Sequence, residues 1–134
     1  RFEVRMRGTS SSSDAEIRQI LQTTDIIVGA AKAGVCVVSR AQLEEAENLI
    51  VAADVNAVPP AGIEGVDVHD LGKPLDFTPR KALGIGALAI GNIKYKVHYR
   101  MFELMKGSDR PLYLDHARAF ECAREFAARK FTGA

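Results

Sequence analysis

The sequence has no tryptophan, only two cysteines and only three histidines. Cys36 and Cys122 lie far apart and match no spacing of a zinc site or a dithiol redox motif. Without a cluster of histidine, cysteine and carboxylate residues, no protein-bound metal is expected. The two cysteines are expected to pack among apolar neighbours, in a reduced, cytoplasmic setting.

The sequence also lacks a large excess of positive or negative charge, and it lacks long apolar runs. The 18 Lys and Arg residues nearly balance the 17 Asp and Glu residues, so no nucleic acid and no membrane surface is expected as a partner. No apolar run reaches the ~18 residues that a membrane span needs. The 134 residues, 47% of them hydrophobic, suffice for one globular domain with a core. Because Arg1 stands in place of an initiator Met, we expect the sequence to be part of a longer chain.

Five segments have the composition of β-strands. They are 2–6, 25–30, 49–55, 66–69 and 81–84. The segments 25–30 and 49–55 are continuous apolar runs, which are typical of buried parallel strands. The stretches 56–65 and 71–80 contain several prolines and glycines and are expected to be loops.

Helical segments separate these strands. Ser13 with Glu16, and Ser39 with Gln42, have the spacing of a capping box and predict the starts of two helices. The second of these helices is expected to run to about Asn48. Strands that alternate with capped helices indicate βαβ units, so we predict an α/β fold with a parallel sheet flanked by helices.

Two further helices are expected in the last third of the chain. Apolar residues recur at three- and four-residue steps from 85 to 106, and Gly107 ends this pattern. The last helix is expected to start near Asp115 and has a wide apolar face. That face either packs on another domain or chain, or covers one face of the sheet.

The fold predicts where a ligand would bind. In parallel sheets of this kind, ligands bind at the carboxyl ends of the strands. The loops after Val28 and Val55 would then form the binding edge. Gly29, Ala30 and Ala31 are small enough for the backbone to approach a ligand and donate N–H groups to it. A tight turn with no ligand explains the same residues equally well.

Two other residues are candidates for binding a cofactor. Asn56 follows a strand, and its side chain can offer both a donor and an acceptor to a carboxamide or a ribose. The alternative is a structural Asx turn before the Pro59–Pro60 pair. Lys94 shares a helix face with Gly91 and His98, opposite the main apolar stripe, where a cation could hold a phosphate. The alternative is an ordinary solvated lysine.

Three segments together resemble the NAD(P)-dependent methylene-tetrahydromethanopterin dehydrogenases of methylotrophic bacteria. The similarity runs in one order from about Asp25 to Met105. The segments are Asp-Ile-Ile-Val-Gly-Ala at 25–30, Ala-Asp-Val-Asn-Ala-Val-Pro-Pro-Ala-Gly-Ile-Glu-Gly-Val-Asp at 53–67, and Ala-Leu-Ala-Ile-Gly-Asn-Ile-Lys-Tyr-Lys at 87–96.

The resemblance implies a two-domain enzyme that transfers a hydride from a methylene-pterin to NADP, or in one branch NAD. Residues 1–106 would be the C-terminal part of a Rossmann-like cofactor domain that lacks its first β-α-β unit. Residues 107–134 would form a helix that packs on an absent pterin-binding domain. Lys94 is implied to hold cofactor phosphate, and the loops at 29–31 and at Asn56 are implied to lie near the nicotinamide half. A cytoplasmic homo-oligomer is expected.

Two alternatives remain open at this point. Methylene-tetrahydrofolate dehydrogenases share the architecture and act on a different pterin. A non-catalytic half-Rossmann module for oligomerisation or regulation would share the fold alone. No acid/base pair or nucleophile stands out, and hydride transfer requires none from this segment, since it depends mainly on holding two carbons close together.

Overall fold

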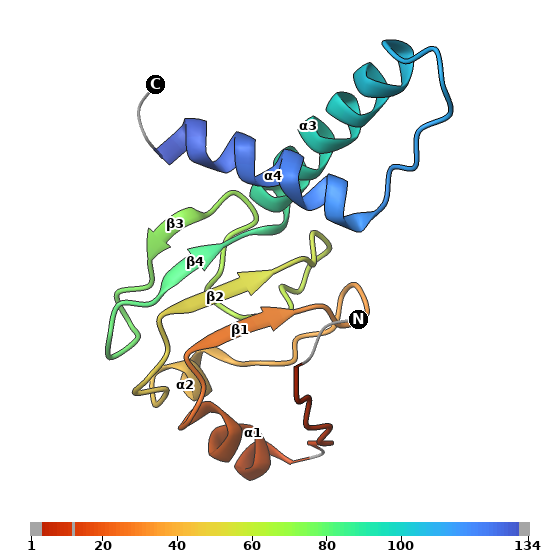
Figure 1. Ribbon diagram of the computed structural model, residues 1–134. Coiled ribbons are helices and arrows are strands. Elements are labelled where there is room, and N and C mark those ends of the chain that lie inside the picture. Colours follow the sequence, from red (N-terminus) through yellow and green to blue (C-terminus); the bar gives the residue numbers. More distant parts are fainter. Residues whose placement is uncertain (1–3, 12, 132–134) are drawn as a thin grey trace.

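The computed structural model describes residues 4–11 and 13–131 as a sheet with helices on both of its sides (Figure 1). In chain order the elements are α1 (Asp14–Leu21), β1 (Ile26–Gly29), α2 (Arg40–Leu43), β2 (Val51–Asp54), β3 (Leu71–Pro74), β4 (Leu83–Ile85), α3 (Ala87–Lys106) and α4 (His116–Phe131). The α/β class that the sequence predicts is confirmed.

The four strands form one sheet in the order β1-β2-β4-β3. Strands β1, β2 and β4 are parallel, and β3 joins the edge of β4 in the antiparallel direction. The sheet is therefore mixed rather than wholly parallel. On its other edge, β1 has no neighbouring strand among the described residues.

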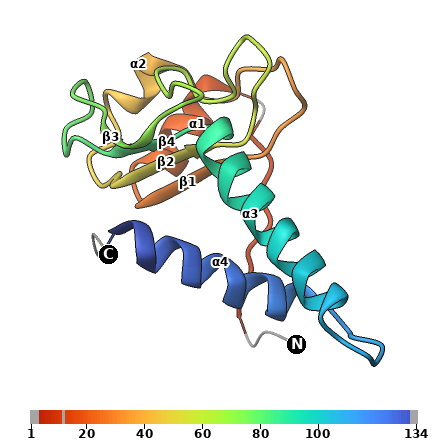
Figure 2. The ribbon, with the colours of Figure 1, turned by 90° about the horizontal axis from the view of Figure 1, so that it is seen from above.

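Helices α1 and α2 cover one face of the sheet, which Figure 2 shows edge-on. Both capping boxes that the sequence predicts are present: Ser13 and Ser39 each accept the backbone N–H three residues on. The core lies between these helices and the sheet. It consists of Leu21, Val38, Leu43, Ala46, Leu49, Ala52, Ile63, Val66, Leu75 and Ala82.

The opposite face of the sheet is apolar and largely uncovered. Side chains alternate between the two faces of a strand, and the register places Ile26 beside Val51 and Leu83, one residue away from the core-facing row. Ile26 is 58% exposed, Val28 63% and Leu83 41%. We call Ile26, Val28, Leu71 and Leu83 the open face. The expectation that β1 is buried was wrong, because the described chain supplies no layer over this end of the sheet.

Helix α2 is shorter than the expected run to Asn48, because it ends at Leu43. After that residue the backbone continues with turns in which Ala46 N–H donates to Leu43 and Leu49 N–H donates to Ala46. Ala46 and Leu49 are fully buried. Through these turns both side chains lie in the core.

Two expectations around β3 were wrong. The segment 66–69 is not a strand, because Asp67 and Asp70 bond its backbone into turns: Asp70 Oδ2 accepts Asp67 N–H, and Asp67 Oδ1 accepts His69 N–H. Leu71–Pro74, expected as loop, is a strand instead. A bulge interrupts its register at Gly72, and an edge strand tolerates both this bulge and Pro74.

The first expected strand, 2–6, is not formed over the part that the structure describes. Residues 4–6 are exposed and have no regular structure, and residues 2 and 3 lie outside the described residues. Of the two cysteines, Cys122 is buried as expected, whereas Cys36 is exposed.

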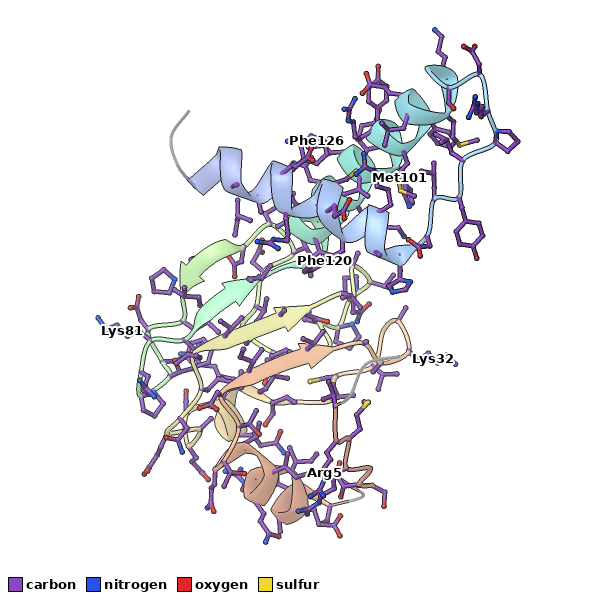
Figure 3. The ribbon with its side chains drawn as sticks, in the orientation of Figure 1. Arg5, Lys32, Lys81, Met101, Phe120 and Phe126 are labelled. Carbon is purple, nitrogen blue, oxygen red and sulfur yellow. The ribbon has the colours of Figure 1, made fainter. Side chains whose placement is uncertain are left out.

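Helices α3 and α4 pack against each other on the side of the sheet away from α1 (Figures 1 and 2). The Asp115 carboxylate caps α4 by accepting the N–H groups of Ala117 and Arg118. An apolar groove of about 780 Å³ lies between the two helices and the nearest strands. Met101 of α3 and Phe120 of α4, both labelled in Figure 3, line this groove.

Candidate functional site

The carboxyl ends of β1 and β2 lie side by side. Gly29 is in register with Asp54, and Val55 N–H donates to the Gly29 carbonyl oxygen at 3.0 Å. The loops that follow the two strands, 30–38 and 55–64, therefore begin at the same edge of the sheet. This is the arrangement that the sequence predicts for a ligand-binding edge.

A buried carboxylate closes the second loop on itself. Asp54 is 2% exposed. Its Oδ1 accepts the N–H of Asn56 at 3.0 Å and its Oδ2 accepts the N–H of Ile63 at 3.0 Å. Gly62 leaves room for this carboxylate, because a Cβ there would lie 2.8 Å from Asp54 Oδ1. Asp54 thus holds both ends of the 55–63 segment.

The side chain of Asn56 joins the two loops. It is buried, and its Oδ1 accepts the N–H of Val58 at 3.0 Å and the N–H of Gly34 at 3.4 Å. Its Nδ2 donates to the carbonyl oxygen of Pro60 at 2.9 Å. The Asx turn that the sequence left open as an alternative is present. Direct binding of a ligand by the Asn56 side chain stays a prediction: its Oδ1 could accept from a ligand only by releasing one of these bonds, whereas its Nδ2 has a second hydrogen to donate.

Backbone bonds fix the bases of the same two loops. The Gly62 carbonyl oxygen accepts the N–H groups of Val37 and Val38 at 2.8 and 3.2 Å. Glu64 N–H donates back to Val38, and the Glu64 carboxylate accepts Arg40 N–H at 2.7 Å. The loops form one bonded unit at the edge of the sheet.

The tip of the first loop is free to meet a ligand. Ala30 and Ala31 are exposed, and their N–H groups donate no hydrogen bond within the described part of the chain. Lys32 follows them and points away from the sheet (Figure 3). Small side chains beside free N–H donors suit the close approach of a nucleotide carboxamide or phosphate.

Lys94 lies on a different element from the other site residues. It is exposed on α3, and its ammonium forms no ion pair among the described residues. Helix α3 follows β4, which runs parallel to β2, so its first turn lies at the same edge of the sheet as the loops. Lys94 and His98 line the apolar groove with Ile90, rather than lying opposite the apolar stripe as expected.

The structure brings Gly29, Ala30, Ala31 and Asn56 together at one edge and places Lys94 on the neighbouring helix. Sequence reasoning missed Asp54 as part of this site. Its signal was an acidic residue at the end of an otherwise apolar strand, which is costly unless the carboxylate is hydrogen-bonded.

Other kinds of site receive no support from the described residues. Nowhere in 4–11 and 13–131 do three or more histidine, cysteine or carboxylate residues converge to hold a metal ion. Among the same residues, every helix is too short or too polar to cross a bilayer.

The mostly parallel sheet, with two bonded loops of small residues at its carboxyl edge, defines a Rossmann-like α/β domain. No known family model matches the chain. The chain is 42% identical over 127 residues to the NAD(P)-dependent methylenetetrahydromethanopterin dehydrogenase of Methylorubrum extorquens, and this match covers 95% of the chain. It is 28% identical over 131 residues to the bifunctional protein MdtA of the same organism. The resemblance that the sequence indicates is confirmed.

The match spans only part of these relatives. Each match includes 95% of this chain but spans only 42% of the length of the curated relative. More than half of the length of each relative therefore lies outside the match.

Proposed function

We propose that this chain forms the cofactor-binding part of an oxidoreductase that transfers a hydride from methylene-tetrahydromethanopterin to NADP, or NAD, during one-carbon oxidation of formaldehyde. The observation that carries the proposal is the 42% identity over 95% of the chain to a dehydrogenase of that name. The bonded loops at the carboxyl ends of β1 and β2 supply the matching site.

The residues at this edge suit a dinucleotide. The N–H groups of Ala30 and Ala31 can donate to the nicotinamide half. Gly29 leaves room for the side chains of Ile63 and Asp54 beneath the strand end, because a Cβ there would lie 3.0 Å from Ile63. Lys94 supplies a cation for a phosphate at the neighbouring helix. When bound, the nicotinamide supplies the carbon that accepts the hydride.

The role of the protein in such a reaction is mainly one of placement. Hydride transfer requires two carbons to be held close together away from water. Asp54 and Asn56 fix the loops that border the proposed nicotinamide position. Such a reaction requires no acid or base from this chain.

The uncovered surfaces support a proposal for the domain organisation. We propose that residues 1–106 belong to the cofactor domain and that residues 107–134 reach toward a pterin-binding domain. A further β-α-β unit would cover the apolar open face and would pair with the edge of β1, which has no neighbouring strand among the described residues. The longer polypeptide is proposed to be a cytoplasmic homo-oligomer that takes a pterin, and neither nucleic acid nor membrane, as its partner.

A spectrophotometric assay tests the function. A polypeptide that contains this chain and the remaining length of the relatives is mixed with NADP and either methylene-tetrahydromethanopterin or methylene-tetrahydrofolate. We expect NADPH to form with the first pterin and much more slowly with the second. The reverse order would favour the folate enzyme, and no NADP binding with no turnover would favour a non-catalytic module.

A further inference from the structure

The loops at the proposed cofactor edge are held together by two side chains that act in series. Asp54 accepts the N–H groups of Asn56 and Ile63, and Asn56 in turn accepts the N–H group of Gly34 in the other loop. Both side chains are buried. The position of the Ala30–Ala31 tip therefore depends, through Asn56, on the carboxylate of Asp54.

The bonds of Asn56 leave little capacity for a ligand. Its Oδ1 already accepts two N–H groups and its Nδ2 donates to Pro60. An amide oxygen offers two lone pairs, so both acceptor positions of Asn56 are occupied inside the protein. The Asn56 oxygen is therefore not available to accept from a cofactor at this edge, and its main role there is to order the backbone that the cofactor would meet.

We infer that Asp54 and Asn56 are positioning residues for NADP, an inference that rests on the proposed function. They set its affinity by holding the two loops in the binding geometry, and they accept no hydrogen bond from the NH₂ group of its carboxamide. Asp54 is the first member of the pair because it fixes the backbone of Asn56. The described chain shows no other side chain that bonds to both ends of the 55–63 segment.

The test compares three substitutions in the longer polypeptide. Asp54→Asn keeps the shape of the side chain, but an amide can accept only one of the two N–H groups and presents a donor to the other. Asn56→Ala removes the link to Gly34. Thr78→Val is the matched control, because it also removes buried hydrogen bonds, to Leu75 and Ala82. These bonds lie in the turn before β4, at the end of the strands opposite to the two loops.

The first readout is binding of two cofactors by each variant. NADP is compared with its 3-acetylpyridine analogue, which has no amide NH₂ group. We expect Asp54→Asn and Asn56→Ala to raise the Kd of both cofactors by the same factor, about tenfold. Thr78→Val should leave both Kd values unchanged. A loss in Asn56→Ala that is several-fold larger for NADP than for the analogue would show direct carboxamide binding and overturn the inference.

The second readout is amide hydrogen exchange. A loss of global stability alone would speed exchange throughout the chain, and not only in the two loops. Asp54→Asn should speed exchange over 55–63 and 30–34 while leaving the amides of α1 at the rate that unfolding sets. An Asp54→Asn protein that folds and binds NADP with the wild-type Kd would also overturn the inference.

Two further experiments test the inference if the substituted proteins do not fold. If Asp54→Asn does not fold, Gly62→Ala tests the same carboxylate, because its Cβ would lie 2.8 Å from Asp54 Oδ1. If neither folds, NADP is added to the wild-type protein: it should slow exchange at Asn56 and Ile63, and no slowing there overturns the inference. Failure of the wild-type protein to bind NADP would instead remove the proposed function itself.

Discussion

A Cβ atom on Gly86 would lie 2.0 Å from the carbonyl oxygen of Asp67 and 2.5 Å from that of Val68. The backbone at the start of α3 thus passes directly over the 66–70 turn. Two hydrogen bonds join the segments there: Gly86 N–H donates to Asp70, and Leu88 N–H donates to Val68. The direction in which α3 leaves the sheet, and with it the position of Lys94, is fixed by this contact.

Gly86→Ala is therefore expected to lower the free energy of unfolding by about 2 kcal/mol or more, since backbone must move to admit the methyl group. The matched control is Gly91→Ala in the same helix, where a Cβ meets nothing within 4 Å. That change is expected to stabilise the protein by roughly 0.5–1 kcal/mol. Urea denaturation measures both, and equal effects of the two substitutions would contradict the packing described.

Lys94→Ala is expected to raise the KM for NADP about tenfold, with a much smaller change in kcat. The reason is that loss of a charge-assisted bond to phosphate weakens cofactor binding equally in the ground state and in the transition state. Lys96→Ala is the control, since Lys96 is an exposed lysine of the same helix that lies outside the groove. Steady-state kinetics on the longer polypeptide decide the matter. An unchanged KM in Lys94→Ala would remove this residue from the site.

Val28→Lys tests whether the rest of the polypeptide covers the open face. Val28 is 63% exposed in the chain as described, so a lysine there should change the unfolding free energy of the 134-residue chain by less than about 0.5 kcal/mol. In the longer polypeptide the same lysine would be buried without a partner, and a loss of about 2 kcal/mol or more is expected. Similar small effects in both proteins would mean that the open face stays in water.

The contact between α1 and α2 has an acid-sensitive component. The Arg18 guanidinium, and after it the Gln42 amide, hold the pKa of Asp14 below its usual value of 3.8 by hydrogen bonding to the carboxylate. Because this pKa is depressed in the folded state, the stabilisation is present above the unfolded value and is lost as the pH falls through the folded value.

Arg18→Ala should therefore raise the pKa of Asp14 toward 3.8 and weaken the acid dependence of unfolding. An NMR titration of the Asp14 carboxyl in both proteins measures the shift. Glu121→Gln, which removes an exposed partner of Arg118 on α4, should leave the titration of Asp14 where it was. A midpoint that is the same with and without Arg18 would refute the assignment.

What could be predicted from the sequence was local. Both capping boxes could be predicted, because Ser13 and Ser39 bond to backbone only three residues away. The parallel pairing of β1 and β2 followed from two apolar runs separated by a capped helix. The end of α2 could not be predicted in this way, since it depends on Ala46 turning into a core that the whole chain builds.

The site was predicted in part for the same reason. Gly29, Ala30 and Ala31 follow a strand, and the position of such a loop comes from the topology alone. The role of Asp54 depends on Ile63, nine residues further on, which reaches the carboxylate only once the loop has folded back. The exposure of Val28 depends on which segments pack over β1, and no local sequence pattern reveals that.

Over the part of the chain that the structure describes, the outer edge of β1 pairs with no strand, and this has a consequence for handling the protein. An edge strand with β-branched side chains is a template on which a second chain can add a strand. A change that uncovers this edge is therefore expected to promote aggregation of the protein. Light scattering, rather than enzyme assay, would then give the first sign of such damage.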